Sequence, residues 1–232
     1  MVRHVYDRAR QAKTLDDVVI ATDDARVMEA VEDFDGHAVM TSASCPTGTD
    51  RLAEASRQID ADIYVNVQGD EPMINPAMID LAVNALKADS EAAISTLSLP
   101  LRHLAEMMSD AVVKVVTDAR GHALYFSRSP IPHVRTPERT LEAAARAAIA
   151  AGITRKHLGL YVFRREALAA FAAFPPSPLE PFEQLEQLRA LHHGLKIRVA
   201  PVEGDATVAV DTPEDLERVR TLMTPAAPPN PN

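Results

Sequence analysis

Short apolar runs rich in β-branched residues alternate with stretches of helical periodicity along the first half of the chain. The apolar runs predict strands at 17–22, 37–41, 63–68 and from 92 onward. The amphipathic stretches between them predict helices at 24–34, 48–59 and 76–88, the last beginning at a proline. Strands that alternate with helices are typical of βαβ units. The pattern therefore predicts an α/β fold with a mainly parallel sheet and helices on both of its faces.

The middle of the chain departs from this alternation. Residues 112–116 and 123–126 read as two strands that flank the hairpin-like turn at 118–121, and a third strand is predicted at 158–163 after an Ala-rich stretch. We expect residues 112–164 to form an antiparallel excursion that carries a subunit contact, within one domain spanning 1–223. The proline-rich tail, 224–232, is expected to be disordered.

Composition and charge narrow the function. The net charge is −9, with 24 basic and 33 acidic residues, and the basic residues are dispersed, which argues against nucleic acid as a partner. No apolar run is long enough to cross a bilayer, and the polar N-terminus does not resemble a secretory signal, so we expect no membrane insertion. A single cysteine, Cys45, has no partner for a disulfide, which favours a reducing, cytoplasmic location.

Two acidic segments stand where a metal site is plausible. Asp70 follows an apolar strand and Gly69, at the carboxyl end of the predicted sheet, where ligands bind in open α/β folds. Asp211 lies before Pro213. Mg²⁺ needs only one or two carboxylates and takes its other oxygens from water and phosphate. Each segment also has a structural interpretation: Asp70 in a turn that bonds its own backbone, and Asp211 or Thr212 as a helix cap.

Other residues carry weaker signals on their own. Thr47-Gly48-Thr49-Asp50-Arg51 leads into a helix whose free N–H groups suit a polar ligand, and it is equally a good capping sequence. His157 begins an apolar strand beside Arg155 and Lys156, where a surface or core histidine is the ordinary interpretation. P-loop, dinucleotide-binding and serine-hydrolase motifs do not occur in the sequence.

Eight segments, in order along the chain, resemble the 3-deoxy-manno-octulosonate (KDO) cytidylyltransferases. They are IATD (20–23), TGTDRLAE (47–54), VNVQGDEPMI (65–74), VVKVV (112–116), ALYFSRSPIP (123–132), RKHLGLYVFR (155–164), SPLEPFEQLEQLRAL (177–191) and VDTPEDLERVR (210–220).

The resemblance implies a nucleotidyltransferase-type α/β fold with an antiparallel part used in homodimerisation. It also implies a reaction: transfer of CMP from CTP to the acid sugar KDO, with release of pyrophosphate and with Mg²⁺ as cofactor. The product would serve lipopolysaccharide biosynthesis in the cytoplasm.

The resemblance also assigns roles to particular residues. Asp70 and Asp211 are implied as the catalytic carboxylates that bind the metal. Thr47, Gly48, Thr49 and Arg51 are implied beside the cytidine and ribose. The residues implied in binding the sugar are Gln68, Arg128, His157, Tyr161, Glu186 and Gln187, with Arg155 and Lys156 as further partners of its carboxylate.

One part of the family pattern is not found in this sequence. The family begins with a strand and a Gly-, Arg- and Lys-containing loop that cradles the CTP phosphates, whereas residues 1–6 resemble the helix that follows this loop. We therefore expect the first strand and loop to be missing and the chain as printed to be unstable and nearly inactive. Three other interpretations stay open: a non-catalytic remnant, a cytidylyltransferase for another acid sugar such as sialic acid, and a metal-dependent glycosyltransferase.

Overall fold

The computed structural model describes residues 1–204, 210 and 212–223. The predicted elements are present, with slightly shorter bounds in most cases. The N-terminal half contains α1 (Val2–Ala9), β1 (Ile20–Thr22), α2 (Ala25–Glu32), β2 (Ala38–Met40), α3 (Gly48–Ala55), β3 (Ile63–Asn66), α4 (Pro76–Ala88) and β4 (Ile94–Pro100). The rest contains α5 (Leu104–Met108), β5 (Lys114–Thr117), β6 (Ala123–Ser127), α6 (Leu141–Ala150), β7 (Arg155–Arg164), α7 (Arg165–Ala173), α8 (Glu180–Glu183), α9 (Gln187–His192), β8 (Ile197–Pro201) and α10 (Pro213–Met223).

The main sheet has six strands and is mixed in direction. Along its path the order is β6-β5-β7-β4-β8, and β3 pairs with the C-terminal part of β7. Strands β3, β4, β5 and β8 share one direction, whereas β7 and β6 run opposite to them. Strands β3 and β4 run parallel, as the predicted βαβ pattern implies, but the long strand β7 lies between them and runs in the opposite direction. Strands β1 and β2 form a separate parallel pair.

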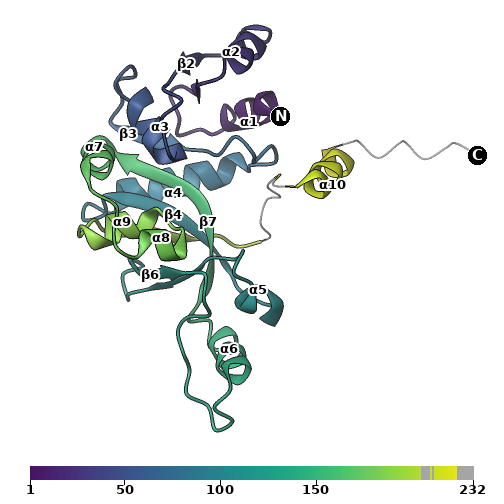
Figure 1. Cartoon of the computed structure of the whole chain (residues 1–232), viewed down its shortest axis with the longest axis vertical. Coiled ribbons are helices and arrows are strands. Elements are labelled where there is room, and N and C mark those ends of the chain that lie inside the picture. Colours follow the sequence, from purple (N-terminus) through teal and green to yellow (C-terminus); the bar gives the residue numbers. More distant parts are fainter. Residues whose placement is uncertain (205–209, 211, 224–232) are drawn as a thin grey trace, which may run out of the picture.

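Helices cover both faces of the sheet, which confirms the predicted α/β class (Figure 1). On one face α1 and α4 pack on apolar side chains of β4, β7 and β8, with Ile79 and Leu86 fully buried. On the other face α7 and α9 cover Tyr161 and Phe163 of β7. Because α3 also packs on this second face, its N-terminus lies near α9 and β3.

The antiparallel excursion predicted at 112–164 is present. Strands β5 and β6 form an antiparallel hairpin, and β7 continues that arrangement by pairing antiparallel with β5. Between β6 and β7 the chain forms a long loop and α6, which projects from one end of the sheet and packs against α5 (Figure 1). Among the described residues, no helix is long and apolar enough to cross a membrane. The predicted disorder of 224–232 concerns residues outside the described ones.

Candidate active site

The N-terminus of α3 contacts the loop that follows β3. Thr47 caps α3: its hydroxyl accepts from the Asp50 amide and donates to the Asp50 carboxylate. Gly48 lies directly under the side chain of Gln68, since a Cβ at position 48 would stand 3.1 Å from Gln68 Oε1. The predicted nucleotide segment and a predicted sugar residue are thus adjacent, and a side chain at position 48 would force the Gln68 amide to shift.

A buried hydroxyl joins α3 to the segment before α9. Thr49 is fully buried, accepts from Asn66 Nδ2 at 3.3 Å, and donates to Glu186 Oε1 at 2.5 Å. Burial raises the pKa of the Glu186 carboxyl, and the hydrogen bonds from Thr49 and Thr47 oppose that rise. These contacts connect β3, α3 and α9, so residues separated by more than a hundred positions in the sequence meet at one place.

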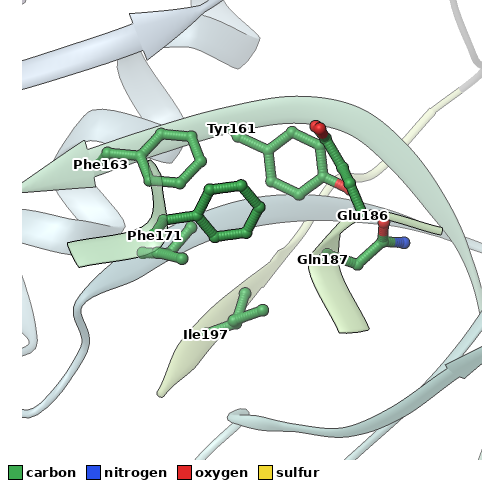
Figure 2. Close-up of a pocket in the computed structure, with 7 residues that line it drawn as sticks. Tyr161, Phe163, Phe171, Glu186, Gln187 and Ile197 are labelled. Atoms are coloured by element: carbon green, nitrogen blue, oxygen red, sulfur yellow. The ribbon is translucent and has the colours of Figure 1, made fainter. Parts of the chain in front are cut away.

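A small cavity of about 10 Å³ lies beside Glu186, between β7, α7 and β8. Figure 2 shows its lining, with the rings of Phe163 and Phe171 on one side and the polar ends of Glu186 and Gln187 on the other. Glu186 Oε2 and Gln187 Nε2 are buried, and among the described residues neither has a hydrogen-bond partner. Buried polar atoms without partners are uncommon and mark places where a ligand or water completes the bonding.

Tyr161 and His157 extend this surface along β7. The His157 ring lies 5.4 Å from the Tyr161 ring and 4.9 Å from Phe126, measured between ring centroids. Burial lowers the pKa of His157 to about 3 and raises the pKa of Tyr161 well above its usual value, with the Glu186 charge contributing to the latter. Both groups are therefore neutral around pH 7 and can take part in hydrogen bonds but not in ion pairs.

Asp70 lies just beyond the carboxyl end of β3, as the sequence predicts. Its carbonyl accepts a hydrogen bond from the amide of Val210 at 2.8 Å, so the chain just before the second predicted carboxylate reaches this strand end. Within the part of the chain that the structure describes, the Asp70 carboxylate has no hydrogen-bond or ion-pair partner. Asp211 itself lies outside the described residues.

A carboxylate without a partner at this edge fits a hard divalent cation, which needs one or two carboxylates from the protein. The described residues contain no group of three or more His, Cys, Asp or Glu side chains arranged to hold a metal. A dedicated all-protein cage is thus not seen among them, and a single carboxylate such as that of Asp70 suits an ion such as Mg²⁺ that keeps water and phosphate ligands.

The cationic residues lie in different settings. Arg51 bonds to the Thr41 hydroxyl at 2.6 Å and pairs with Asp23 at 3.3 Å, which ties α3 to the ends of β1 and β2. The Arg128 guanidinium donates to the main-chain carbonyls of Glu183, Asp110 and Gln184. Arg155 is likewise bonded to Ser98 and to the carbonyl of Val202, and Lys156 pairs with Glu106. In this structure these four side chains hold protein segments together, so their predicted sugar and nucleotide contacts stay predictions.

A buried ion network that no sequence motif indicated lies beside the site, centred on Arg189. Arg189 is buried, donates to Glu180 at 2.5 and 3.1 Å, lies 3.7 Å from Asp50, and stacks over the Phe171 ring at 4.7 Å. Asn66 was also missed. The available signals were an amide within an apolar strand and an arginine flanked by apolar residues, Leu188 and Ala190, both of which are unusual for buried positions.

Comparison with known proteins identifies the family of this chain. The profile of the family described as "Cytidylyltransferase" matches residues 1–197. The chain belongs to this family.

Its relatives and solved neighbours agree with this. The chain is 51% identical to the 3-deoxy-manno-octulosonate cytidylyltransferase of Geobacter metallireducens, covering 94% of this chain and 85% of the relative. It is 51% identical to the enzyme of that name from Syntrophotalea carbinolica, over 96% of this chain and 88% of the relative. It is also similar to the solved structure of CMP:2-keto-3-deoxy-manno-octonic acid synthetase complexed with CTP, with 42% identity, a TM-score of 0.85, and coverage of 96% of this chain and 86% of that one. The nucleotidyltransferase-type fold is thereby confirmed.

Proposed function

We propose that this protein transfers CMP from CTP to KDO, giving CMP-KDO and pyrophosphate. The observation that carries the proposal is the meeting of residues 47–51, Gln68 and Glu186 at the carboxyl end of β3. It rests on the Gly48–Gln68 approach and the Thr49–Glu186 hydrogen bond. The support from relatives is that proteins about half identical over nearly the whole chain bear the name of this activity.

In this proposal the residues divide into two binding surfaces. Thr47, Gly48, Thr49 and Arg51 lie on the nucleotide side, where the N-terminus of α3 offers its N–H groups to polar atoms of the ligand. Gln68, His157, Tyr161, Glu186 and Gln187 lie on the sugar side, with Arg128 as a partner of the sugar carboxylate. The unpartnered Glu186 Oε2 and Gln187 Nε2 then bind sugar hydroxyls, which removes the cost of leaving them unbonded.

Asp70 and Asp211 are proposed to hold Mg²⁺. When bound, the ion supplies positive charge that neutralises the reacting phosphate. Asp70 contributes a carboxylate that no other described side chain occupies, and Val210 fixes its backbone. The two surfaces orient a sugar hydroxyl toward the α-phosphate, and this positioning of two substrates is itself a large part of catalysis in phosphoryl-type transfer.

The assembly and location are part of the same proposal. We propose a homodimer formed through the excursion at 112–164, supported by exposed apolar side chains there: Leu124 is 62% exposed, and Leu141 and Ile153 are each 49% exposed. The free thiol of Cys45 fits a cytoplasmic enzyme. CMP-KDO made there would serve lipopolysaccharide biosynthesis. Sedimentation of the chain at increasing concentration tests the dimer, and a monomer throughout contradicts it.

The activity is tested by pyrophosphate release from CTP in the presence of Mg²⁺, with KDO or sialic acid as acceptor. The assay compares the chain as printed with one extended upstream in frame. In the extended chain we expect release with KDO but not with sialic acid as acceptor, and a loss on the order of 10²-fold or more in Asp70→Asn. The matched control is Asp60→Asn, at the opposite end of β3, where an exposed pair with Arg165 contributes little to stability. Release with sialic acid instead of KDO contradicts the sugar assignment, and full activity of Asp70→Asn contradicts the metal assignment.

A further inference from the structure

The hydroxyl of Thr96, in the middle of β4, lies within hydrogen-bond distance of three groups on β7. His157 Nε2 is at 2.9 Å, the Leu158 carbonyl at 3.0 Å and the Leu160 carbonyl at 2.8 Å, and Thr96 is fully buried. The strand register explains this cluster. Thr96 is opposite Tyr161 but Leu97 is opposite Leu158, so β7 bulges between these two pairs. The bulge brings two main-chain carbonyls and the His157 ring to one side chain.

The single proton of the Thr96 hydroxyl determines which nitrogen of the His157 ring carries a hydrogen. A threonine hydroxyl has one proton to donate and two lone pairs to accept with. The two carbonyls can only accept, so the proton points to them. If it pointed to His157 instead, both carbonyl oxygens would face a hydroxyl lone pair at about 3 Å with no proton between them. Nε2 must therefore carry a hydrogen and donate it to Thr96.

This arrangement leaves Nδ1 as the free nitrogen of the ring. In the described part of the chain Nδ1 has no hydrogen-bond partner. Burial lowers the pKa of His157 to about 3, so a second proton is not held around pH 7 and Nδ1 keeps its lone pair. Phe126 and Tyr161 flank the ring and restrict its rotation.

We propose that Thr96 is a positioning residue that fixes His157 as the Nε2–H tautomer, so that Nδ1 accepts a hydrogen bond from a hydroxyl of the sugar. This inference rests on the proposed function, because it assigns what His157 recognises in that site. The chemical consequence is specific. An acceptor at Nδ1 binds a hydroxyl donor and disfavours a carboxylate, a phosphate or a deoxygenated carbon at the same place.

The tautomer is measured directly, without substrate, by long-range ¹H–¹⁵N correlation on the ¹⁵N-labelled full chain. We expect the His157 Nε2 signal to show a bound proton and the Nδ1 signal to be that of an unprotonated nitrogen. The same pattern is expected in Thr96→Ser, which keeps the hydroxyl, whereas Thr96→Val is expected to show a mixture of tautomers. A protonated Nδ1 in the unsubstituted protein overturns the proposal whatever the variants do.

The role in recognition is measured by the affinity for KDO in the same three proteins. We expect Thr96→Val to weaken KDO binding several-fold to about tenfold with CTP binding unchanged, and Thr96→Ser to restore it. The matched control is Ser95→Ala, which removes a buried hydroxyl bonded to the Ala82 carbonyl on the same strand and does not contact His157. Equal affinity of Thr96→Val and the unsubstituted protein overturns the positioning role. If the expected tautomer is found but the unsubstituted chain does not bind KDO, the proposed function is wrong. The role of Thr96 in sugar recognition is then wrong as well, although its effect on the His157 tautomer stands.

Discussion

The Thr49 hydroxyl donates a hydrogen bond of 2.5 Å to Glu186 Oε1, and this contact joins the N-terminus of α3 to the segment that begins α9. Thr49 is held by a further bond, since Asn66 Nδ2 donates to its hydroxyl. The nucleotide side and the sugar side of the proposed site therefore share one buried polar contact. A change at either residue is expected to affect both surfaces.

Thr49→Val is expected to lower the free energy of unfolding by about 1–3 kcal/mol, because it leaves Asn66 Nδ2 and Glu186 Oε1 buried without their partner. Thr49→Ser keeps the hydroxyl and loses one buried methyl group, at a cost of about 1 kcal/mol. Urea unfolding measures both. The control is Thr154→Val, because the Thr154 hydroxyl is buried without a partner among the described residues, so its loss is expected to be neutral or stabilising. A Thr49→Val variant as stable as Thr49→Ser contradicts the role of this hydrogen bond.

Glu186 is expected to make stability depend on pH with a definite sign. Burial raises the pKa of its carboxyl above the ordinary 4.5, so the folded state binds this proton more tightly than the unfolded state. The stabilisation that comes from this tighter proton binding is fully present below pH 4.5. It is lost as the pH rises through the pKa of Glu186 in the folded state. Glu186→Gln cannot ionise, so it is expected to gain stability relative to the unsubstituted protein across that range.

The measurement is the difference in unfolding free energy between the two proteins as the pH is raised from about 3 to about 8. Glu54→Gln is the contrasting variant, because the pKa of Glu54 is lowered and its contribution to stability changes with pH in the opposite direction. The Cys45 thiol and the Ser42 amide bond to Glu54 and lower its pKa, so its contribution is present above 4.5 and is lost as the pH falls. A Glu186→Gln difference that is flat, or that falls with rising pH, argues against a raised pKa.

The elements were predictable from local sequence, whereas their neighbours in the sheet were not. The apolar run at 63–68 and the periodicity with Pro76 at its start were enough to predict β3 and α4, since each signal lies within its own segment. Nothing local to β3 or β4 indicates that β7, far along the chain, lies between them. Its position depends on how β7 pairs with both strands, which is a property of the whole sheet.

The site was predicted in the same uneven way. The motif containing Thr47 to Arg51 identified the correct helix terminus, but a capping sequence looks the same whether or not its threonine is bonded to a distant glutamate. Thr96 gave no signal, because a threonine in a buried strand is common and its bond to His157 arises only through the bulge in β7. The resemblance named candidate residues, and the structure adds the contacts that some of them, such as Thr49 and Glu186, make with one another.

Arg189 is expected to be a major contributor to the stability of the site. Replacing it by Met leaves the partly buried carboxylates of Glu180 and Asp50 without their shared cation, and the cost approaches that of a broken buried ion pair, about 3–5 kcal/mol. Arg189→Lys is also expected to destabilise, because lysine cannot form the forked contact with Glu180 or stack as a plane on Phe171. Urea unfolding of these variants is compared with Arg146→Ala, which removes an exposed helical pair with Glu142 at a cost of about 0.5 kcal/mol or less. Similar losses at both positions contradict a special role of the buried network.

Gly48→Ala is expected to weaken sugar binding without unfolding the protein. The added methyl group would lie 3.1 Å from Gln68 Oε1, and the Gln68 amide, at the end of a flexible side chain, is the group that must move. We expect the KM for KDO to rise several-fold, because a misplaced amide forfeits a hydrogen bond to the sugar, while the free energy of unfolding changes by less than about 1 kcal/mol. A double-mutant cycle with Gln68→Ala tests the cause: once the amide is gone, the methyl group has nothing to displace. If Gly48→Ala raises the KM for KDO equally with and without the Gln68 amide, the added methyl group acts on the ligand directly. In that case the effect does not pass through Gln68.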